Sequence, residues 1–383
     1  MIPYGRHHID KDDLLAVNKV LKSNFLTQGP LISKFEKLIS NYVGSKYAVV
    51  VSSCTAGLHL ASIVSNNKNG KKLLTSPISF VSTANSSIFT GGDVIFADIE
   101  SDTGNISIDN INKILKKKKI NSISPVHFGG LPCDMKSINK LKKKHKFTIY
   151  EDAAHSFGAQ YDKKNKVGSC KYSDMTVFSF HPVKSIAMGE GGCITTNNKE
   201  IFERLSKIRN HGIEKQNKNF LFKNKKNQPW YYEMQELGYH YRATDIQCAL
   251  GISQLKKINK FLKKRRQIAK YYDNEFSDLK YAKPLQFNRR DLSSNHLYIL
   301  LIDFDKIGKS RAEVMKHLRK ANIITQVHYI PITHHPYYKK LGLKSKLNET
   351  ENYYKKALSI PIFYDLKKKE QKHIVQSLKK IIK

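Results

Sequence analysis

Between residues 46 and 200 the sequence repeats one order of hydrophobic and polar positions: a short apolar run, a turn of small or polar residues, and a stretch with helical spacing. This order is typical of a mainly parallel sheet covered by helices. We therefore expect an α/β fold here. Strands are predicted for the apolar runs at residues 47–51, 72–75, 93–97, 120–126, 147–150, 176–180 and 192–195.

After about residue 245 the pattern changes. The elements predicted there are a Lys-rich helix over residues 246–276, a strand near 297–304, a helix over 311–321 and a second strand near 324–329. Because 383 residues exceed the usual size of one hydrophobic core, we predict a large domain over residues 1–250 and a smaller α+β domain over residues 251–383. Residues 216–229 carry many Lys and Asn and few apolar side chains, which predicts a mobile loop.

The formal net charge of +35 is typical of proteins that bind nucleic acid, because Lys and Arg neutralise phosphates. The lysines, however, fall in short runs at residues 116–119, 142–144 and 367–369, with helical spacing and no interleaved aromatic residues. This pattern favours solvated helix faces, so we expect no nucleic-acid partner. The positive field would still attract an anionic diphosphate substrate.

No apolar run approaches the roughly 20 residues of a membrane-spanning helix, and residues 1–13 lack the apolar core of a signal peptide. We therefore expect a cytoplasmic protein with no membrane partner. The five cysteines never form C-x-x-C, which argues against a disulfide framework and a zinc knuckle, and we expect them to be reduced and mostly buried. No metal is predicted, because His, Cys and carboxylates lack the spacing of metal ligands.

Ligands of open parallel sheets bind beyond the carboxyl ends of the strands, so the residues after each apolar run are candidates for chemistry. The first predicted strand runs through residues 52–55 (SSCT) into a helix. Free N–H groups at such a helix start form an anion pocket, although helix capping explains Ser and Thr there equally well. Another strand ends at Glu151 and Asp152. Since side chains alternate, we expect one carboxylate to face the site, as a metal ligand, a general base or the partner of a protonated heterocycle.

Lys184 follows a third strand end, among apolar and small neighbours that predict its burial. Burial lowers the pKa of a lysine toward that of a nucleophilic amine able to form a Schiff base. Phe80 follows a fourth strand and is placed to stack on an aromatic ligand, although a core role is commoner for phenylalanine. Amine, anion pocket and carboxylate together meet the needs of pyridoxal 5′-phosphate, whose protonated pyridine ring serves as an electron sink.

The chain resembles the DegT/DnrJ/EryC1/StrS family of sugar aminotransferases over nearly its whole length. The motifs that carry this resemblance are residues 25–30 (FLTQGP), 53–56 (SCTA), 151–155 (EDAAH), 178–184 (FSFHPVK), 189–192 (GEGG), 237–242 (LGYHYR) and 244–247 (TDIQ). The tracts 2–6 (IPYGR), 294–298 (SNHLY) and 325–331 (TQVHYIP) resemble one branch, the transaminases of pseudaminic acid biosynthesis. The resemblance implies an aspartate aminotransferase-like large domain with a mainly parallel mixed sheet, plus a smaller α+β C-terminal domain.

The resemblance also implies roles for individual residues. Lys184 would hold the cofactor as an imine, Asp152 would pair with the pyridine nitrogen, and His155 would lie beside the ring hydroxyl. Phe80 would stack on the ring. The phosphate would be surrounded by Cys54, Thr55, Ala56 and Ser179 and, from the second subunit of a homodimer, by His240, where many members have Asn. The sugar nucleotide would lie near Tyr4, Asn24, Phe25, Leu26, Thr27, Gln326, His328 and Tyr329, although a structural role is equally common for such histidines and tyrosines.

The implied reaction moves an amino group from L-glutamate to C4 of a UDP-linked 4-keto-6-deoxy sugar in two half-reactions, with Lys184 moving a proton in each. An aminotransferase that acts at C3 or on another C4 ketone is an alternative within the family. A related dehydratase is disfavoured, because those enzymes carry histidine in place of this lysine. The alternatives from other classes are a basic nucleic-acid-binding protein and a homologue without catalysis.

Overall fold

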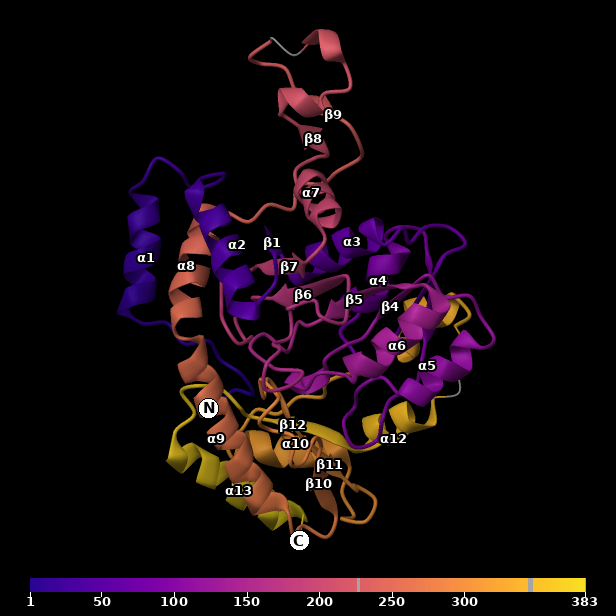
Figure 1. The fold of residues 1–383 in the computed structure, drawn as a ribbon. Coiled ribbons are helices and arrows are strands. Elements are labelled where there is room, and N and C mark those ends of the chain that lie inside the picture. The colour runs from indigo at the N-terminus through magenta and orange to yellow at the C-terminus, as the bar shows by residue number, and fades with distance from the viewer. Residues whose placement is uncertain (226–227, 344–346, 383) are drawn as a thin grey trace.

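The computed structural model describes residues 1–225, 228–343 and 347–382, and its largest element is a sheet of seven strands in the order β1-β7-β6-β5-β4-β2-β3 (Figure 1). The strands are β1 (Tyr47–Val51), β2 (Lys72–Thr75), β3 (Asp93–Phe96), β4 (Ser122–Ser124), β5 (Thr148–Asp152), β6 (Met175–Ser179) and β7 (Gly192–Thr196). Only β7 runs antiparallel to its neighbours, β1 and β6. All the strands predicted between residues 46 and 200 are confirmed, with small differences at their ends.

Helices cover both faces of this sheet because successive strand residues point to opposite sides. Val50 of β1 packs in one core with Phe35, and its neighbour Val49 packs in another core with Leu58. The helices around the sheet are α2 (Pro30–Val43), α3 (Cys54–Val64), α4 (Ser82–Ile88), α5 (Ile108–Leu115), α6 (Met135–His145) and α7 (Lys199–Ile208). The α1 helix (Lys11–Leu21) lies outside this layer and packs against α8 (Asp245–Lys256).

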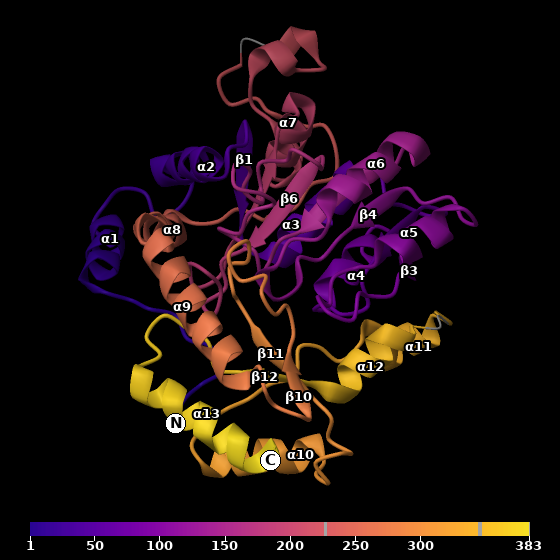
Figure 2. The same cartoon turned by 60° about the horizontal axis from the view of Figure 1, so that its bottom comes forward.

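The C-terminal part has its own core around a three-stranded antiparallel sheet (Figure 2). Its strands are β10 (Ala282–Pro284), β11 (Tyr298–Ile302) and β12 (Ala357–Ile360), and its helices are α9 (Ile258–Phe276), α10 (Arg311–Lys320), α11 (Pro336–Lys340), α12 (Asn348–Lys356) and α13 (Lys368–Ile382). The first residues of the chain join this part, since Ile2 pairs with Ile323. The predicted combination of an α/β sheet with a smaller α+β part is confirmed.

Two C-terminal predictions need correction. The helix predicted over residues 246–276 is two helices, α8 and α9, which meet at Lys257. The strand predicted near 324–329 is wrong, because only Gln326 pairs with β12, through Ser359. Side chains take up backbone groups that a ladder would use: the Gln326 side-chain oxygen accepts from the Val327 N–H at 2.9 Å, and the Tyr353 hydroxyl donates to the His328 carbonyl.

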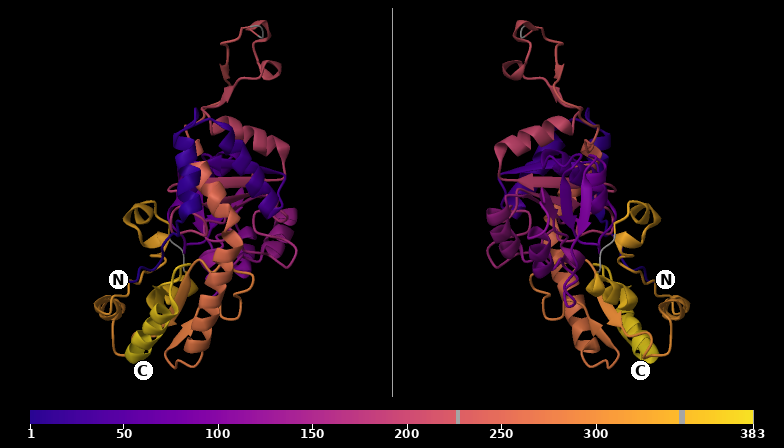
Figure 3. Two further views of the ribbon diagram at one scale, coloured as in Figure 1. Left: turned by 90° about the vertical axis from the view of Figure 1, so that its left-hand side faces the viewer. Right: turned by 90° about the vertical axis from the view of Figure 1, so that its right-hand side faces the viewer.

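A narrow arm projects from the end of α7, away from the rest of the molecule (Figure 3). It contains β8 (Ile213–Glu214), β9 (Glu233–Met234) and the short 3-10 turns η2 (Asn217–Asn219) and η3 (Lys223–Lys225). The segment predicted as a mobile loop, residues 216–229, lies in this arm, and its residues 226–227 lie outside the described ones. The remaining 3-10 turns are η1 (Phe128–Gly130) and η4 (Ile332–His334).

The cysteines agree with the expectation of reduced, mostly buried thiols. All five cysteines are free, and all except the half-buried Cys54 are buried. Among the helices of the described ranges, none combines the length and the apolar stretch that crossing a bilayer would need.

Candidate functional site

The carboxyl ends of β1, β2, β5 and β6 meet at one edge of the large sheet. These strands share one direction, because β7 is antiparallel to both β1 and β6 and the others pair in parallel. Gly192 of β7 lies in register with Val51 and Ser179 at this edge. A side chain at Gly192 would come within 2.7 Å of the Cys54 backbone nitrogen, so glycine lets the start of α3 cross β7 closely.

The start of α3 provides N–H groups at this edge. The hydroxyl of Ser53 caps the helix by accepting from the Ala56 N–H at 3.1 Å. Within the part of the chain that the structure describes, the N–H groups of Cys54 and Thr55 have no acceptor. The side chain of Ser179 is buried beside them at the end of β6. Such N–H groups at a helix start can bind an anion, as the residues 52–55 predict.

The two neighbouring acids at the end of β5 point in opposite directions. Both are buried, but Asp152 accepts from the Thr83 hydroxyl at 2.5 Å and from the Ala154 N–H at 3.1 Å. Burial raises the pKa of Asp152, and the bond from Thr83 opposes that shift. Glu151 contacts none of these groups. The two carboxylates therefore have separate sets of partners, as the alternation of side chains along a strand requires.

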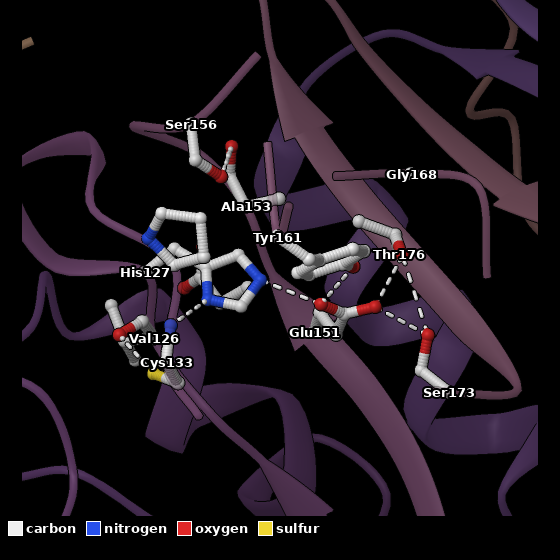
Figure 4. A network of polar contacts seen from close by, with 12 residues as sticks. Val126, His127, Cys133, Glu151, Ala153, Ser156, Tyr161, Gly168, Ser173 and Thr176 are labelled. Carbon is white, nitrogen blue, oxygen red and sulfur yellow. Dashed lines mark hydrogen bonds and ion pairs between the residues drawn. The ribbon is translucent and has the colours of Figure 1, made fainter. Parts of the chain in front are cut away.

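Glu151 is instead the centre of a separate polar network (Figure 4). It accepts from His127 Nε2 at 2.6 Å, from the Tyr161 hydroxyl at 2.5 Å, from the Thr176 hydroxyl at 2.8 Å and from the Ser173 hydroxyl. Burial alone would raise the pKa of Glu151, but the hydrogen bonds lower it below its ordinary value. Glu151 is therefore an ionised, fully partnered carboxylate that holds β5 in place.

Lys184 lies in the loop between β6 and β7. A hydrogen bond from the Lys184 backbone N–H to the His181 carbonyl closes a turn in this loop. Burial lowers the pKa of Lys184 to about 8, and the positive charge of Arg265 adds to this effect. Cys54 and Asp152 act on this pKa in the opposite direction. A lysine with this pKa is a nucleophile near neutral pH.

This pKa predicts how Lys184 reacts in the protein without cofactor. An acylating reagent should label Lys184 with a rate that rises through about pH 8, and the exposed Lys199 is followed in the same digests as a reference for the reagent. Mass spectrometry of peptides labelled across a pH series measures both rates. Between about pH 8 and 10.5 the unfolded chain binds the Lys184 proton and the folded chain does not, so the contribution of Lys184 to stability rises with pH. A labelling rate of Lys184 that rises only near the ordinary lysine value of about pH 10 would contradict the assignment.

Aromatic and histidine side chains gather around His155. His155 Nε2 lies 2.9 Å from the Tyr329 hydroxyl, and His155 Nδ1 is buried without a partner in the described residues. Burial lowers the pKa of His155 well below its ordinary value, so the ring is neutral. Ring contacts connect Tyr329 to Phe80 at 6.4 Å and, through His328, to Tyr4. Phe80 is 60% exposed, which excludes the core role and leaves its ring face free to stack.

The other predicted residues are not joined to this group by a hydrogen bond or ring contact in the described ranges. His240 is exposed and pairs with Asn210. Gln326 is exposed near β12. The tract before α2 is also exposed, and its Thr27 pairs with Thr244. The residues of this tract before α2 are Asn24, Phe25, Leu26 and Thr27.

Three residues near the site were missed from the sequence. Thr83 donates to Asp152, the ring of His296 lies 4.5 Å from that of His155, and Arg265 acts on the pKa of Lys184. His296 belongs to the tract 294–298, which had pointed only to a family branch. Thr83 follows Phe80 by one helical turn, a signal that could have found it. Arg265 lies in a Lys- and Arg-rich helix without a local signal.

The family of this chain follows from its sequence. The model of the DegT/DnrJ/EryC1/StrS aminotransferase family matches residues 7–379. The chain belongs to this family. It is 38% identical over 384 residues to the UDP-4-amino-4,6-dideoxy-N-acetyl-β-L-altrosamine transaminase of Campylobacter jejuni. The aligned region covers 100% of this chain and 98% of that protein.

Solved structures of DegT-type aminotransferases have the same fold. Helicobacter pylori PseC, an aminotransferase involved in the biosynthesis of pseudaminic acid, superposes with a TM-score of 0.90 at 33% identity and covers 100% of this chain and 99% of that one. The PLP-form of the putative sugar aminotransferase Spr1654 of Streptococcus pneumoniae superposes with a TM-score of 0.88 at 25% identity, covering 99% and 98%. The aspartate aminotransferase-like fold, the enzyme class and the cofactor expected from the sequence are therefore confirmed: the protein is a pyridoxal-phosphate-dependent sugar aminotransferase.

The residues at the sheet edge fit this cofactor. The α3 N–H groups without acceptors suit a phosphate, and a lysine with a lowered pKa suits an aldehyde. The buried Asp152 has a protonated ring nitrogen as a natural partner, because a buried carboxylate needs a counter-charge. The unpartnered Nδ1 of His155 leaves one further polar group for the ligand.

Proposed function

We propose that this enzyme transfers an amino group from L-glutamate to C4 of a UDP-linked 4-keto-6-deoxy N-acetyl sugar, UDP-2-acetamido-2,6-dideoxy-β-L-arabino-hex-4-ulose, in pseudaminic acid biosynthesis. The observation that carries this substrate is the full-length similarity to the altrosamine transaminases of C. jejuni and H. pylori, at 38% and 34% identity. The lowered pKa of Lys184 at the sheet edge supports the reaction type.

In this proposal Lys184 binds the cofactor covalently and moves the proton in each half-reaction. Pyridoxal phosphate supplies an electron sink when its pyridine nitrogen is protonated. Asp152 keeps that nitrogen protonated, and Thr83 holds the carboxylate by a bond to one oxygen. An amine with a pKa of about 8 can accept and return a proton near neutral pH, which general acid–base catalysis requires.

The other proposed cofactor contacts follow from the same geometry. His155 lies beside the ring hydroxyl, with its Nδ1 unpartnered and its Nε2 held by Tyr329. The exposed ring of Phe80 stacks on the pyridine. The phosphate binds at the start of α3. Its proposed contacts are Cys54, Thr55, Ala56 and Ser179.

The sugar nucleotide is proposed to bind on the open side of the His155 group. Tyr4 and His328 contact each other at a ring distance of 5.2 Å, and His328 contacts Tyr329 at 4.9 Å, so these three side chains form one contact group. Gln326, which lies just before His328 in the chain, has an exposed side chain. The exposed residues Asn24, Phe25, Leu26 and Thr27 complete the proposed set.

We also propose a homodimer in which each subunit completes the site of the other. The arm exposes apolar side chains that a lone subunit would leave in water, and His240 lies exposed near its base. His240 is proposed to donate to the phosphate bound by the second subunit. The exposed fractions of the apolar side chains are 68% for Leu221, 64% for Phe222, 75% for Trp230, 56% for Tyr232, 63% for Met234 and 70% for Leu237.

Trp230 provides a test of the dimer. It is the single tryptophan of the chain, and its side chain is 75% exposed. Trp230→Ala is expected to raise the dimer dissociation constant about 10-fold or more, because a buried interface tryptophan is a typical hot spot. Sedimentation velocity across a dilution series measures the constant, with Tyr337→Ala, 53% exposed on α11, as the control. A fully active monomer at every concentration would refute the shared site.

The proposed substrate is tested by product analysis. The purified enzyme is incubated with L-glutamate and the proposed UDP-4-keto sugar, with its C5 epimer, or with a UDP-3-keto sugar, and the products are solved by NMR. An amino group at C4 of the first sugar, formed fastest, is the expected result. Faster amination of either other sugar would place the enzyme elsewhere in the family.

A further inference from the structure

Arg265 of α9 is a buried cation without a counter-ion. Its side chain is 3% exposed, and its Nη1 donates to two carbonyl oxygens, of His296 at 3.3 Å and of Ile362 at 2.8 Å. No carboxylate of the described residues lies within 4.0 Å of it. Neutral carbonyls do not balance a buried charge, whose desolvation costs several kcal/mol unless an anion is near.

A second buried arginine of the C-terminal part shows the usual solution. Arg290 is also 3% exposed, and it donates from Nε at 2.9 Å and from Nη2 at 2.8 Å to the two oxygens of Asp273. Arg265 has no partner for its own Nε and Nη2 within the described ranges. The edge of the guanidinium that Arg290 uses to bind a carboxylate is therefore free in Arg265.

Arg265 lies near the reactive lysine. Arg265 and Lys184 line the same narrow recess, together with Arg6, His7 and His8, and no acidic residue lines it. The charge of Arg265 acts on the pKa of Lys184, which agrees with their closeness. Arg6 and His8 already contact Asp365, at 3.4 Å and 3.0 Å, so Arg265 differs from these neighbours in having no carboxylate partner among the described residues. A buried guanidinium in this state favours an anionic ligand.

We propose that Arg265 binds a carboxylate of the amino donor. The inference rests on the proposed function, because an amino acid must bring its amino nitrogen to the place where Lys184 reacts, and its carboxylates then lie a few bonds away. A planar carboxylate fits the Nε and Nη2 edge with two parallel hydrogen bonds. The cofactor phosphate already has its proposed site at the start of α3. The diphosphate of the sugar nucleotide is attached across the sugar ring from the reacting C4, whereas the α-carboxylate of the donor lies beside its amino nitrogen, so the donor is the anion that fits Arg265.

The test separates the two half-reactions. The donor half-reaction is followed by the spectral change of the bound cofactor on adding L-glutamate without sugar, and the sugar half-reaction is followed by NMR. Arg265→Lys and Arg265→Met are expected to raise the half-saturating glutamate concentration about 10-fold and about 100-fold, with little change in the sugar half-reaction. The control is Arg266→Met, because Arg266 is the neighbouring, partly exposed arginine paired with Asp291.

A binding measurement does not depend on catalysis. Calorimetry of the cofactor-loaded enzyme with maleate, a dicarboxylate that carries no amino group, should show binding that weakens about 10-fold in Arg265→Lys and is unchanged in Arg266→Met. In the wild type, glutamate with its α-carboxylate or its γ-carboxylate amidated should react more weakly, and the sensitive position identifies the carboxylate that Arg265 binds. Unchanged maleate binding in Arg265→Lys, or equal losses in both half-reactions, would overturn the proposal.

The outcomes also distinguish this inference from the proposed function. If the wild type reacts with glutamate but aminates none of the sugars, the proposed substrate fails while the role of Arg265 can still be measured. If Arg265→Lys reacts with glutamate as the wild type does, the role of Arg265 fails and the proposed function stands. A variant that changes only the pH dependence of the donor half-reaction would show that Arg265 tunes Lys184 and would refute carboxylate binding.

Discussion

Replacing Lys184 with alanine is expected to lower kcat by about 10⁴-fold, at the top of the range for the loss of a general acid–base group. The substitution removes the amine that the proposal gives both tasks, binding the cofactor covalently and carrying the proton. No other lysine lines the recess that Lys184 shares with Arg265, so a substitute amine is not at hand among the described residues. Steady-state kinetics and the absorption spectrum of the cofactor-loaded variant measure both losses.

Lys166 provides a matched control for this prediction. Burial also lowers the pKa of Lys166, and its Nζ donates to the Tyr42 carbonyl at 2.9 Å. Lys166→Ala is expected to keep kcat and the spectrum of the wild type, although it loses that hydrogen bond. If Lys184→Ala kept measurable turnover while Lys166→Ala lost it, the proposed role of Lys184 would be wrong.

Asp152→Asn is expected to reduce kcat by about 10²- to 10³-fold, similar to the loss of one electrostatic contact in a transition state. Asparagine keeps the size of the side chain and can still accept from Thr83, so the fold should persist. It cannot balance a positive charge on the ring nitrogen, and the cofactor then loses its strength as an electron sink. Kinetics of both half-reactions and the free energy of unfolding are the measurements.

Glu151→Gln should show the opposite result, although it changes the adjacent residue in the same way. Four side chains donate to Glu151, and an amide offers one oxygen and two donors in place of two accepting oxygens. The expected loss is about 1–3 kcal/mol of unfolding free energy with a modest change in kcat. A variant pair in which Asp152→Asn loses stability and Glu151→Gln loses activity would reverse the assigned roles.

The strands and much of the site could be predicted because their signals are local. Each strand of the large sheet is a short apolar run, so burial could be inferred from the residues themselves. Positions such as Asp152 and Lys184 follow those runs directly, and strands of one direction bring such positions to one edge. The segment near residues 324–329 failed for the converse reason: it has a strand-like composition, but side-chain hydrogen bonds replace its ladder.

What amino-acid order alone established here was which residues carry chemistry and which runs are buried, since both depend on neighbours a few positions apart. Folding decided which groups they meet. Adjacent acids received opposite roles because Thr83 approaches Asp152 while His127 approaches Glu151. Arg265 lies near Lys184 without a counter-ion, whereas its neighbour Arg266 in the same helix pairs with Asp291. Such pairings join residues far apart in the chain, so their energies depend on packing that no local pattern encodes.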